Sequence, residues 1–151
     1  METEKSFGHE VGNKQNVINK WLSTKTSKLK RRNRNLDVFI SPLCLTCIEY
    51  IIEMKRLYAV LTTLRIKVVF YCEGSKKEAK TLKTDFHLPY KVISVDHKSQ
   101  IWISSNVIVT PFYVLRNKKG EMLSSGRFTE DWAQTKSLLL EEFQKSKTLH
   151  P

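Results

Sequence analysis

Two cysteines separated by two residues are the side chains in this sequence best placed to do chemistry. Cys44 and Cys47 lie in residues 41–47, Ser-Pro-Leu-Cys-Leu-Thr-Cys, directly after an apolar run rich in β-forming residues. Cysteines at this spacing can close into a disulfide and open again, so they can exchange electrons with another disulfide. A helix is predicted to start at Leu45, and its unpaired N–H groups would stabilise a thiolate at Cys44 and lower the pKa of that thiol.

The same pair has two other interpretations. Cys44 and Cys47 could ligate zinc, but structural zinc usually takes four ligands from two close pairs, and only Cys72 and four scattered histidines remain. The two could also be inert buried thiols, although their position at a helix start argues against that. Cys72 is expected to be a buried small hydrophobic residue or a bystander thiol. We therefore expect a redox pair with no metal and no organic cofactor.

The periodicity of apolar residues predicts the elements that position this pair. We expect a strand at 36–41, one long helix at 45–64, a strand at 65–71, a helix opened by a Ser75/Glu78 capping box, a strand at 90–95, helical turns at 97–104, hairpin strands at 112–116 and 122–125, and a last helix capped by Thr129. The alternation of strands and helices predicts an α/β fold, with a mixed central sheet of about five strands and helices on both faces.

The chain has room for one domain, since it is 151 residues long. We expect a basic N-terminal extension at 1–35, in which the apolar spacing favours a short helix at 15–24. The folded domain is expected at 36–145, and a C-terminal tail at 146–151.

Positive charge is concentrated near the start of the chain. The formal net charge is +11, and residues 1–35 hold nine basic and three acidic side chains. The densest run, 28–34, could contact phosphates or the headgroups of a membrane surface, or it could be a solvated linker. Nucleic-acid binding is not expected, because no aromatic residue is interleaved with this run to stack on bases.

The ends of the sequence and its hydropathy bear on location. No run approaches the ~18 consecutive apolar residues of a membrane span, and the first five residues, Met-Glu-Thr-Glu-Lys, are not followed by the apolar region of a signal peptide. We therefore expect a cytoplasmic protein. In that compartment a close cysteine pair is more often catalytic, redox-active or metal-binding than a permanent crosslink.

A second motif gives the sequence a resemblance to a known family. Thr110 and Pro111 directly precede the first apolar strand of the predicted hairpin, and Gly120 and Gly126 lie in and after its turn. With the strand–CxxC–helix unit, these features resemble the thioredoxin superfamily over about residues 36–145. The resemblance implies a thioredoxin fold, a cis Pro111 facing the cysteine pair, and a Thr110 backbone that pairs with a bound client.

Within the superfamily, the segment before Cys44 is most similar to the TlpA/ResA-type thiol reductases and the MauD-like proteins. Leu43 stands where thioredoxin has tryptophan, and Thr46 where it has proline. Val38 occupies the position of the buried aspartate that relays a proton from the second cysteine of thioredoxin. Glu73 lies where the TlpA/ResA-type reductases carry a functional glutamate, so we expect it to be a substitute proton acceptor. It could equally be a residue favoured near a helix N-terminus.

These features predict a thiol–disulfide oxidoreductase. Cys44 is the expected nucleophile and Cys47 the resolving cysteine, while Leu43, Thr110 and Pro111 are expected to bind a peptide or protein client. The only other partner required is a redox protein that recycles the pair. In size the chain is also similar to thioredoxin-like proteins of bacterial gene clusters for disulfide-containing peptides such as the sporulation killing factor. The alternative is a thioredoxin-fold peptide-binding module that needs no redox turnover.

Overall fold

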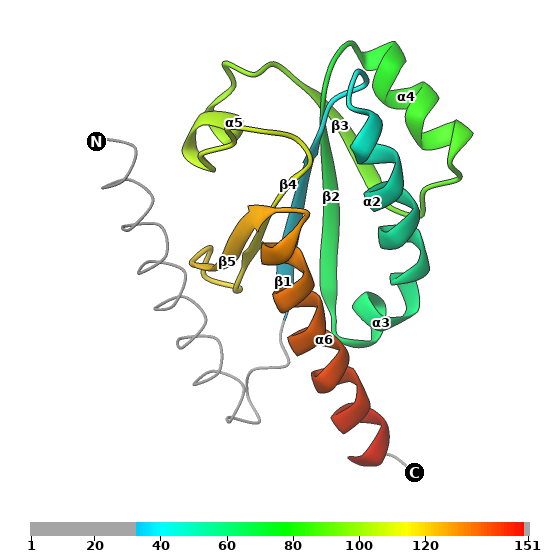
Figure 1. The fold of residues 1–151 in the computed structure, drawn as a ribbon, viewed down its shortest axis with the longest axis vertical. Coiled ribbons are helices and arrows are strands. Elements are labelled where there is room, and N and C mark those ends of the chain that lie inside the picture. The colour runs from blue at the N-terminus through cyan, green and yellow to red at the C-terminus, as the bar shows by residue number, and fades with distance from the viewer. Residues whose placement is uncertain (1–32, 150–151) are drawn as a thin grey trace.

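A five-stranded mixed sheet forms the centre of the protein (Figure 1). The structure is a computed structural model and describes residues 33–149, so the helix expected at 15–24 and most of the basic run 28–34 lie outside the described residues. The strand order is β3-β2-β1-β4-β5. β1, β2 and β3 are parallel, β4 is antiparallel to β1, and β5 is antiparallel to β4, which confirms the predicted mixed sheet. The elements in chain order are β1 (Arg34–Ile40), α2 (Leu45–Arg56), α3 (Tyr58–Thr63), β2 (Ile66–Glu73), α4 (Lys76–Asp85), β3 (Lys91–Val95), α5 (Gln100–Ser104), β4 (Phe112–Arg116), β5 (Met122–Arg127) and α6 (Glu130–Leu149).

Helices cover both faces of the sheet, as the sequence predicts. Leu36, Val38 and Ile40 of β1 point into the larger core, which α2, α3, α4 and α6 complete. Phe39 points to the other face and meets Trp102 of α5 edge-on, with ring centroids 5.4 Å apart. Neighbouring residues of one strand enter different cores because successive side chains of a strand point to opposite faces. Figure 1 shows α5 on one side of the sheet and α2, α3 and α4 on the other.

Three segments that are distant in the sequence meet at one end of the sheet, where β1 and β2 finish. β1 and β2 are parallel and end side by side, with Ile40 opposite Cys72. β4 is antiparallel to β1 and therefore starts at the end of the sheet where β1 finishes, with Phe39 opposite Phe112. This end of the sheet consequently holds three loops: the one that leaves β1, the one that leaves β2 and the one that enters β4.

The long helix predicted at 45–64 is wrong in one respect, because it is two helices separated by Leu57. Leu57 has φ −85° and ψ 3°, outside the regular helical range. The hydroxyl of Tyr90 donates a hydrogen bond to the Met54 carbonyl oxygen at 2.6 Å. In a continuous helix that carbonyl would accept from the N–H of Tyr58. A side chain from a distant segment therefore takes the acceptor at the break.

The first strand and the last helix reach past the limits of the domain expected at 36–145. β1 begins at Arg34, and α6 continues to Leu149. A buried ion pair joins them, with Arg34 Nη2 2.7 Å from Glu142 Oε1. Arg34, which precedes the expected limit, is therefore part of the packed structure.

Two local predictions about chain turns are confirmed. The Ser75 hydroxyl accepts a hydrogen bond from the Glu78 N–H at 3.1 Å, and the Glu78 carboxylate accepts one from the Ser75 N–H at 3.0 Å, which makes the capping box of α4. Gly120 has φ +86° in the turn between β4 and β5, a conformation that a residue with a side chain rarely adopts.

Candidate active site

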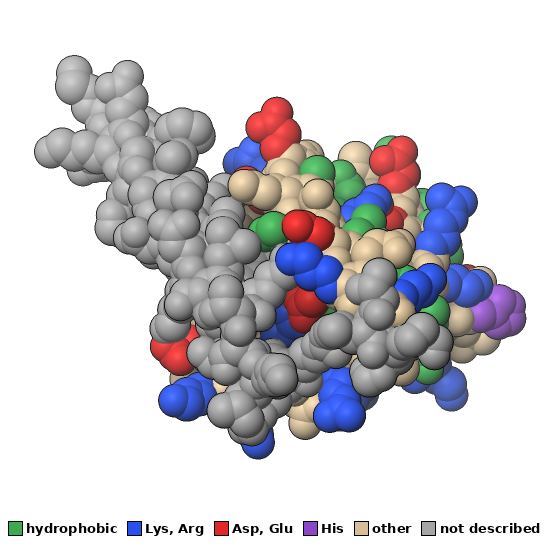
Figure 2. All heavy atoms as spheres, turned by 90° about the horizontal axis from the view of Figure 1, so that it is seen from below, with side chains coloured by type: hydrophobic (Ala, Val, Ile, Leu, Met, Phe, Trp, Pro, Cys, Tyr) green, Lys and Arg blue, Asp and Glu red, His purple; other side chains and the backbone are tan. Residues whose placement is uncertain are grey.

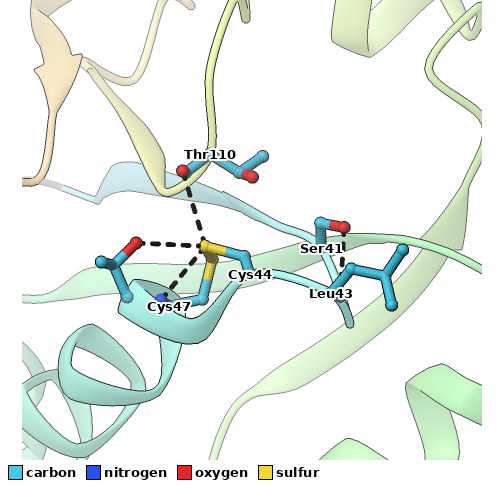
Figure 3. Close-up of a disulfide and its surroundings, with 6 residues drawn as sticks. Ser41, Leu43, Cys44, Cys47 and Thr110 are labelled. Carbon is cyan, nitrogen blue, oxygen red and sulfur yellow. Dashed lines mark hydrogen bonds between the residues drawn. A yellow bond between two sulfur atoms is a disulfide. The ribbon is translucent and has the colours of Figure 1, made fainter.

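The cysteine pair lies where β1 gives way to α2 (Figure 3). Cys44 and Cys47 are joined as a disulfide. Cys44 is the N-cap residue of α2, and its sulfur accepts a hydrogen bond from the Cys47 N–H at 3.1 Å. Cys44 is partly exposed, whereas Cys47 is 1% exposed and belongs to the larger core. The sulfur that a client can reach is therefore that of Cys44, with Cys47 buried behind it.

Thr46 adds a second polar group beside the reactive sulfur. Its hydroxyl oxygen lies 3.3 Å from Cys44 Sγ, and the residue is exposed. In the reduced protein this hydroxyl can donate to a thiolate at Cys44. In the sequence, Thr46 is notable only as a departure from the proline of thioredoxin. A hydroxyl residue in the first turn after a cysteine N-cap was the signal that could have marked it.

The loop before β4 faces the disulfide. The Thr110–Pro111 peptide bond is cis, the isomer that the resemblance implies. The Thr110 carbonyl oxygen lies 3.5 Å from Cys44 Sγ, as Figure 3 shows. Pro111 is buried at the start of β4. The antiparallel pairing of β1 and β4 thus brings Cys44, Cys47 and Thr110 together.

Leu43 precedes Cys44 in a tight turn and is almost completely exposed. Its side chain is 93% exposed, and its N–H donates to the Ser41 hydroxyl at 3.4 Å. In Figure 3 the Leu43 side chain points away from the sulfurs. It lies on the outer surface beside the disulfide, where it is available to an incoming molecule.

Glu73 lies at the same end of the sheet as the cysteine pair but forms no described hydrogen bond with it. It ends β2, is partly exposed, and lines a pocket with Ser94 and Val95 at the end of β3 and with Asp96 and His97 in the loop that follows. Within residues 33–149, no hydrogen bond joins Glu73 to Cys44 or Cys47. Its role as a proton acceptor stays a prediction.

Neither Val38 nor Asp37 of β1 can relay a proton from Cys47, as the buried aspartate of thioredoxin does for its second cysteine. Val38 is fully buried on the face covered by α2. Asp37 points to the opposite face, where its carboxylate lies 3.5 Å from Arg116 Nε. Burial raises the pKa of Asp37, and the Arg116 charge opposes that rise. Because the sheet separates Asp37 from Cys47, Asp37 cannot take the place of the missing aspartate.

Cys72 is a free thiol that the fold protects. It is 0% exposed at the end of β2, which confirms the expectation of a small buried residue. Burial first, and then the negative charges of Glu78 and Glu73, raise its pKa to about 11. Cys72 therefore remains protonated at neutral pH. In the part of the chain that the structure describes, no group of three or more His, Cys, Asp or Glu side chains is arranged to hold a metal ion.

Comparison with known proteins finds similarity in structure. No protein-family model matches the sequence, and no curated protein matches it in sequence. A thiol-disulfide oxidoreductase from Bacteroides fragilis aligns with a TM-score of 0.60 and 16% identity, over 74% of this chain and 85% of that chain. StoA from Bacillus subtilis aligns with a TM-score of 0.54 and 17% identity, over 62% and 72% of the two chains. A secreted Mycobacterium tuberculosis disulfide oxidoreductase homologous to E. coli DsbE aligns with a TM-score of 0.51 and 16% identity, over 59% and 65%.

The comparison contradicts the expected cytoplasmic location. The Mycobacterium tuberculosis protein is secreted, so this fold does not indicate the cytoplasm. Disulfide exchange depends on reduction potential and can operate in oxidising compartments as well as reducing ones, so redox chemistry does not specify a compartment. Among residues 33–149, none of the helices combines the length and the apolarity that crossing a membrane requires.

The fold and the neighbours agree with the resemblance seen in the sequence. The sheet order, the CxxC pair at the start of α2 and the cis Pro111 before β4 occur together in one domain. The chain has the thioredoxin fold, and its structural neighbours are thioredoxin-like thiol–disulfide oxidoreductases.

Proposed function

We propose that the protein is a thiol–disulfide oxidoreductase that reduces, or forms, disulfides in a peptide or protein client through Cys44 and Cys47. One observation carries the proposal: the accessible Cys44 sulfur sits at a helix start and accepts the Cys47 N–H at 3.1 Å. A backbone donor and the positive end of a helix favour a thiolate, which is the reactive form of cysteine.

In the reducing direction, the first step is attack by the Cys44 thiolate on one sulfur of the client disulfide. A bond forms between Cys44 Sγ and that sulfur, the client S–S bond breaks, and the other client sulfur leaves as a thiolate that takes a proton from solvent. The Thr110 backbone, which faces Cys44 Sγ at 3.5 Å, pairs with the client strand, and Pro111 and Leu43 flank it.

The second step releases the client. Cys47 loses its proton, and its thiolate attacks Cys44 Sγ, so the mixed disulfide breaks and the second client sulfur leaves as a thiolate. We assign the proton of Cys47 to Glu73, the carboxylate at the end of the neighbouring strand. Two electrons have then moved to the client, and a dithiol redox partner restores the reduced pair. The reverse sequence would oxidise a client dithiol, and the reduction potential of the pair decides the direction.

Two finer proposals come from the sequence. The client is a disulfide-containing peptide undergoing maturation, because the chain is similar in size to thioredoxin-like proteins of clusters that make such peptides. The basic run 28–34 supplies a peripheral contact with an anionic membrane surface, because clustered lysine and arginine favour anionic headgroups.

Reduction of insulin by the full chain tests the enzymatic proposal. Cys44→Ser should abolish turnover, because no other described thiol is both accessible and placed at a helix start. Cys72→Ala is the matched control and should retain turnover, since Cys72 is buried away from the client. Full insulin reduction by Cys44→Ser would contradict the proposed mechanism.

A peptide-binding module is the second candidate, and one observation favours it. Val38 replaces the carboxylate that would help Cys47 to ionise, and its absence disfavours the resolving step of redox turnover. A double variant, Cys44→Ser with Cys47→Ser, separates the two functions. Unchanged client binding and unchanged biological function in this variant would favour the binding module, and loss of function would favour the enzyme.

A further inference from the structure

Helix α4 carries its positive and its negative charges on opposite flanks. It packs against β3 and turns its apolar residues toward the larger core. At 3.6 residues per turn, Lys76, Lys80 and Lys83 share one flank of the helix. Glu78 and Asp85 share the flank opposite to it. We call the three lysines the lysine row.

The position of Glu78 shows which way the two flanks face. A Cβ atom at Gly74 would lie 3.1 Å from Pro42 Cγ and 3.2 Å from Glu78 Oε1. The Glu78 flank therefore faces the loop between β1 and α2. Because β1 lies inside β2 and β3 in the strand order, the lysine row on the other flank faces outward, over the edge of the sheet that β3 forms.

The charge of the lysine row is not neutralised within residues 33–149. Lys76, Lys80 and Lys83 are exposed, and none of them forms a salt bridge in this part of the chain. Like charges three or four residues apart on a helix repel each other. Lys76 is also the first residue of α4, where the positive end of the helix dipole disfavours a cation. An anionic partner would relieve both repulsions.

β3 supplies an open backbone edge beside the lysine row. It is the outermost strand of the described sheet, and its last four residues are half-buried and uncharged. The Val95 carbonyl oxygen accepts a hydrogen bond from the Gly74 N–H at 3.3 Å, so Val95 turns its backbone groups toward β2. Alternate residues of a strand turn them the other way, so those of Val92 and Ser94 face the open edge. Such a row of backbone groups is a template for a further strand.

The other charges around this edge are mainly positive. Lys91 starts β3 and Lys98 follows it, and both are exposed. Asp96 is exposed as well, with His97 Nδ1 3.5 Å from its carboxylate. Residues 76–98 contain six lysines and three acidic residues, so positive charge dominates. Figure 2 shows mainly Lys and Arg side chains and a His on the right-hand side of the molecule, the side on which α4 lies in Figure 1.

We propose that the lysine row and the outer edge of β3 bind an extended, acidic segment of the client, which pairs with β3 as a sixth strand. The inference rests on the proposed oxidoreductase function and adds a client contact remote from the disulfide. An added strand would lie three strand spacings from β1, or about 14–15 Å. About four or five extended residues span that distance, so the acidic segment lies at least that far along the client from its cysteine.

The two parts of this surface have different tasks. Backbone hydrogen bonds along β3 supply affinity for any extended chain, and the lysine row selects an acidic one. Successive side chains of the added strand point to opposite faces, so only alternate ones face α4. The client segment should therefore carry Asp or Glu at alternate positions. Once this segment is bound, the client disulfide is held near Cys44 at a raised effective concentration.

Fluorescence anisotropy with labelled, cysteine-free peptides tests the surface directly. The first peptide alternates Glu with Thr and Val, the second has Gln in place of Glu, and the third is the Glu peptide methylated on its backbone nitrogens. The full chain should bind the first peptide. Its affinity for the second should be at least about tenfold lower, because the charge is missing. Its affinity for the third should fall by about as much, because methylation removes the backbone donors.

Charge reversal connects the binding to the lysine row. Lys80→Glu with Lys83→Glu should weaken binding of the Glu peptide by on the order of tenfold or more. Both side chains are exposed, so folding should tolerate the change. The matched control is Lys118→Glu with Lys119→Glu, which makes the same change in net charge in the turn between β4 and β5, beside the other edge of the sheet. Its affinity should stay within about twofold of the wild type.

A tethered substrate tests the connection with catalysis. A disulfide-loop peptide carries either the Glu segment or the Gln segment, joined by a Gly/Ser linker of about six residues. At low salt the second-order rate constant of reduction should be on the order of tenfold higher with the Glu segment. The advantage should disappear in Lys80→Glu/Lys83→Glu and at high salt, because screening weakens exposed charge pairs.

The outcomes separate this inference from the proposed function. Reduction of both tethered substrates at equal rates would overturn the inference and leave the proposed function intact. Reduction of neither, with the Glu peptide still bound, would overturn the proposed function and leave the binding surface. Binding of none of the peptides would mean that the lysines only keep other strands away from the edge, and would overturn the inference. Equal affinity for the methylated peptide would remove the strand pairing, and binding of phosphatidylserine vesicles in place of peptides would make the lysine row a lipid contact; either result would also overturn the inference.

Discussion

The ends of two neighbouring strands of this sheet carry cysteines of opposite reactivity, one reactive and one protected. The loop after β1 carries Cys44, and β2 carries Cys72 next to its end, with Ile40 and Cys72 paired across the two strands. Cys44 is partly exposed and its sulfur accepts a backbone N–H, whereas Cys72 is fully buried. Burial and the nearby carboxylates raise the pKa of Cys72 to about 11. Two cysteine side chains at the same end of one sheet thus differ in solvent exposure and in the charges around their sulfurs.

The difference shows that the secondary structure around a thiol, more than its place on the sheet, sets its reactivity. Cys72 is still within the strand ladder and pairs with Ser94 of β3, so its backbone groups are committed to the sheet. Cys44 lies one loop beyond its strand, at the first turn of a helix, where N–H groups have no partner within the helix. A shift of a few residues along the chain therefore separates a reactive sulfur from a protected one.

The largest expected effect comes from removing Cys47. Cys47→Ala should stop turnover and accumulate a mixed disulfide between Cys44 and the client, because the resolving attack on Cys44 Sγ no longer occurs. Intact mass measurement after mixing the reduced variant with a disulfide peptide would detect the adduct. Its persistence over many turnover times of the wild type is the expected result.

The matched control for this experiment is the double variant Cys47→Ala with Cys72→Ala. It should trap the same adduct to the same extent, since Cys72 is buried and protonated. Turnover by Cys47→Ala that disappears when Cys72 is also removed would show that Cys72 resolves the intermediate. That result would show that Cys72 is reactive as well as Cys44.

The chemistry at Cys44 could be anticipated from sequence because its determinants are local. A strand, a CxxC pair and a helix start follow one another within a dozen residues, and Pro111 marks the start of β4 by the same local rules. That Thr110 and Pro111 face the cysteine pair was expected only from the resemblance, because their approach depends on the antiparallel pairing of β1 with β4, which no local pattern in the sequence shows.

The break between α2 and α3 had no local signal either. Apolar residues continue at helical spacing across Leu57, and no glycine or proline interrupts them. The hydrogen bond from Tyr90 to the Met54 carbonyl oxygen comes from a segment 36 residues away. The expected cytoplasmic location failed for a related reason: it was inferred from terminal composition, which does not report where a fold of this kind works.

The next largest effect should appear in alkylation of the reduced protein. At pH 8, a thiol with a pKa of about 11 is ionised in about one molecule in a thousand, against about one in ten at the ordinary value of 9.0. Iodoacetamide should therefore modify Cys72 in the native protein at least about a hundredfold more slowly than in denaturant. Cys44 should react first, and mass spectrometry of peptides distinguishes the three sites.

Raising the pH tests the sign of the pKa shift at Cys72. The shifted group is an acid whose neutral form is favoured by the fold, so the thiolate grows about tenfold per pH unit below pH 11. Alkylation of native Cys72 should accelerate by about a hundredfold from pH 8 to pH 10, and the stability that the neutral thiol contributes should be lost as the pH rises through about 11. An alkylation rate of native Cys72 at pH 8 equal to its rate in denaturant would contradict the raised pKa of this thiol.

A smaller effect should separate two carboxylates that both influence Cys72. Glu78 and Glu73 each help to raise the pKa of that thiol, so Glu78→Gln and Glu73→Gln should both lower it and speed its alkylation at pH 10. Only Glu73→Gln should slow release of the client from the mixed disulfide, because we assign the proton of Cys47 to Glu73. Glu78→Gln is a suitable control, since glutamine also completes a capping box with Ser75. Equal release rates in the two variants would remove Glu73 from the mechanism.

The smallest expected effect belongs to Thr46. Its hydroxyl lies 3.3 Å from Cys44 Sγ, and no corresponding hydroxyl contact is described at Cys72 within residues 33–149. Thr46→Val keeps the shape of an exposed, β-branched residue and removes the donor, so the reduced state loses a hydrogen bond to its thiolate while the disulfide loses little. A net loss of about 1 kcal/mol corresponds to a reduction potential about 20 mV more negative, and equilibration with a glutathione redox buffer measures it. Thr46→Ser should restore the wild-type potential because it returns the hydroxyl. Equal potentials for Thr46→Val and the wild type would mean that the backbone N–H of Cys47, rather than any side chain, makes the Cys44 environment different from that of Cys72.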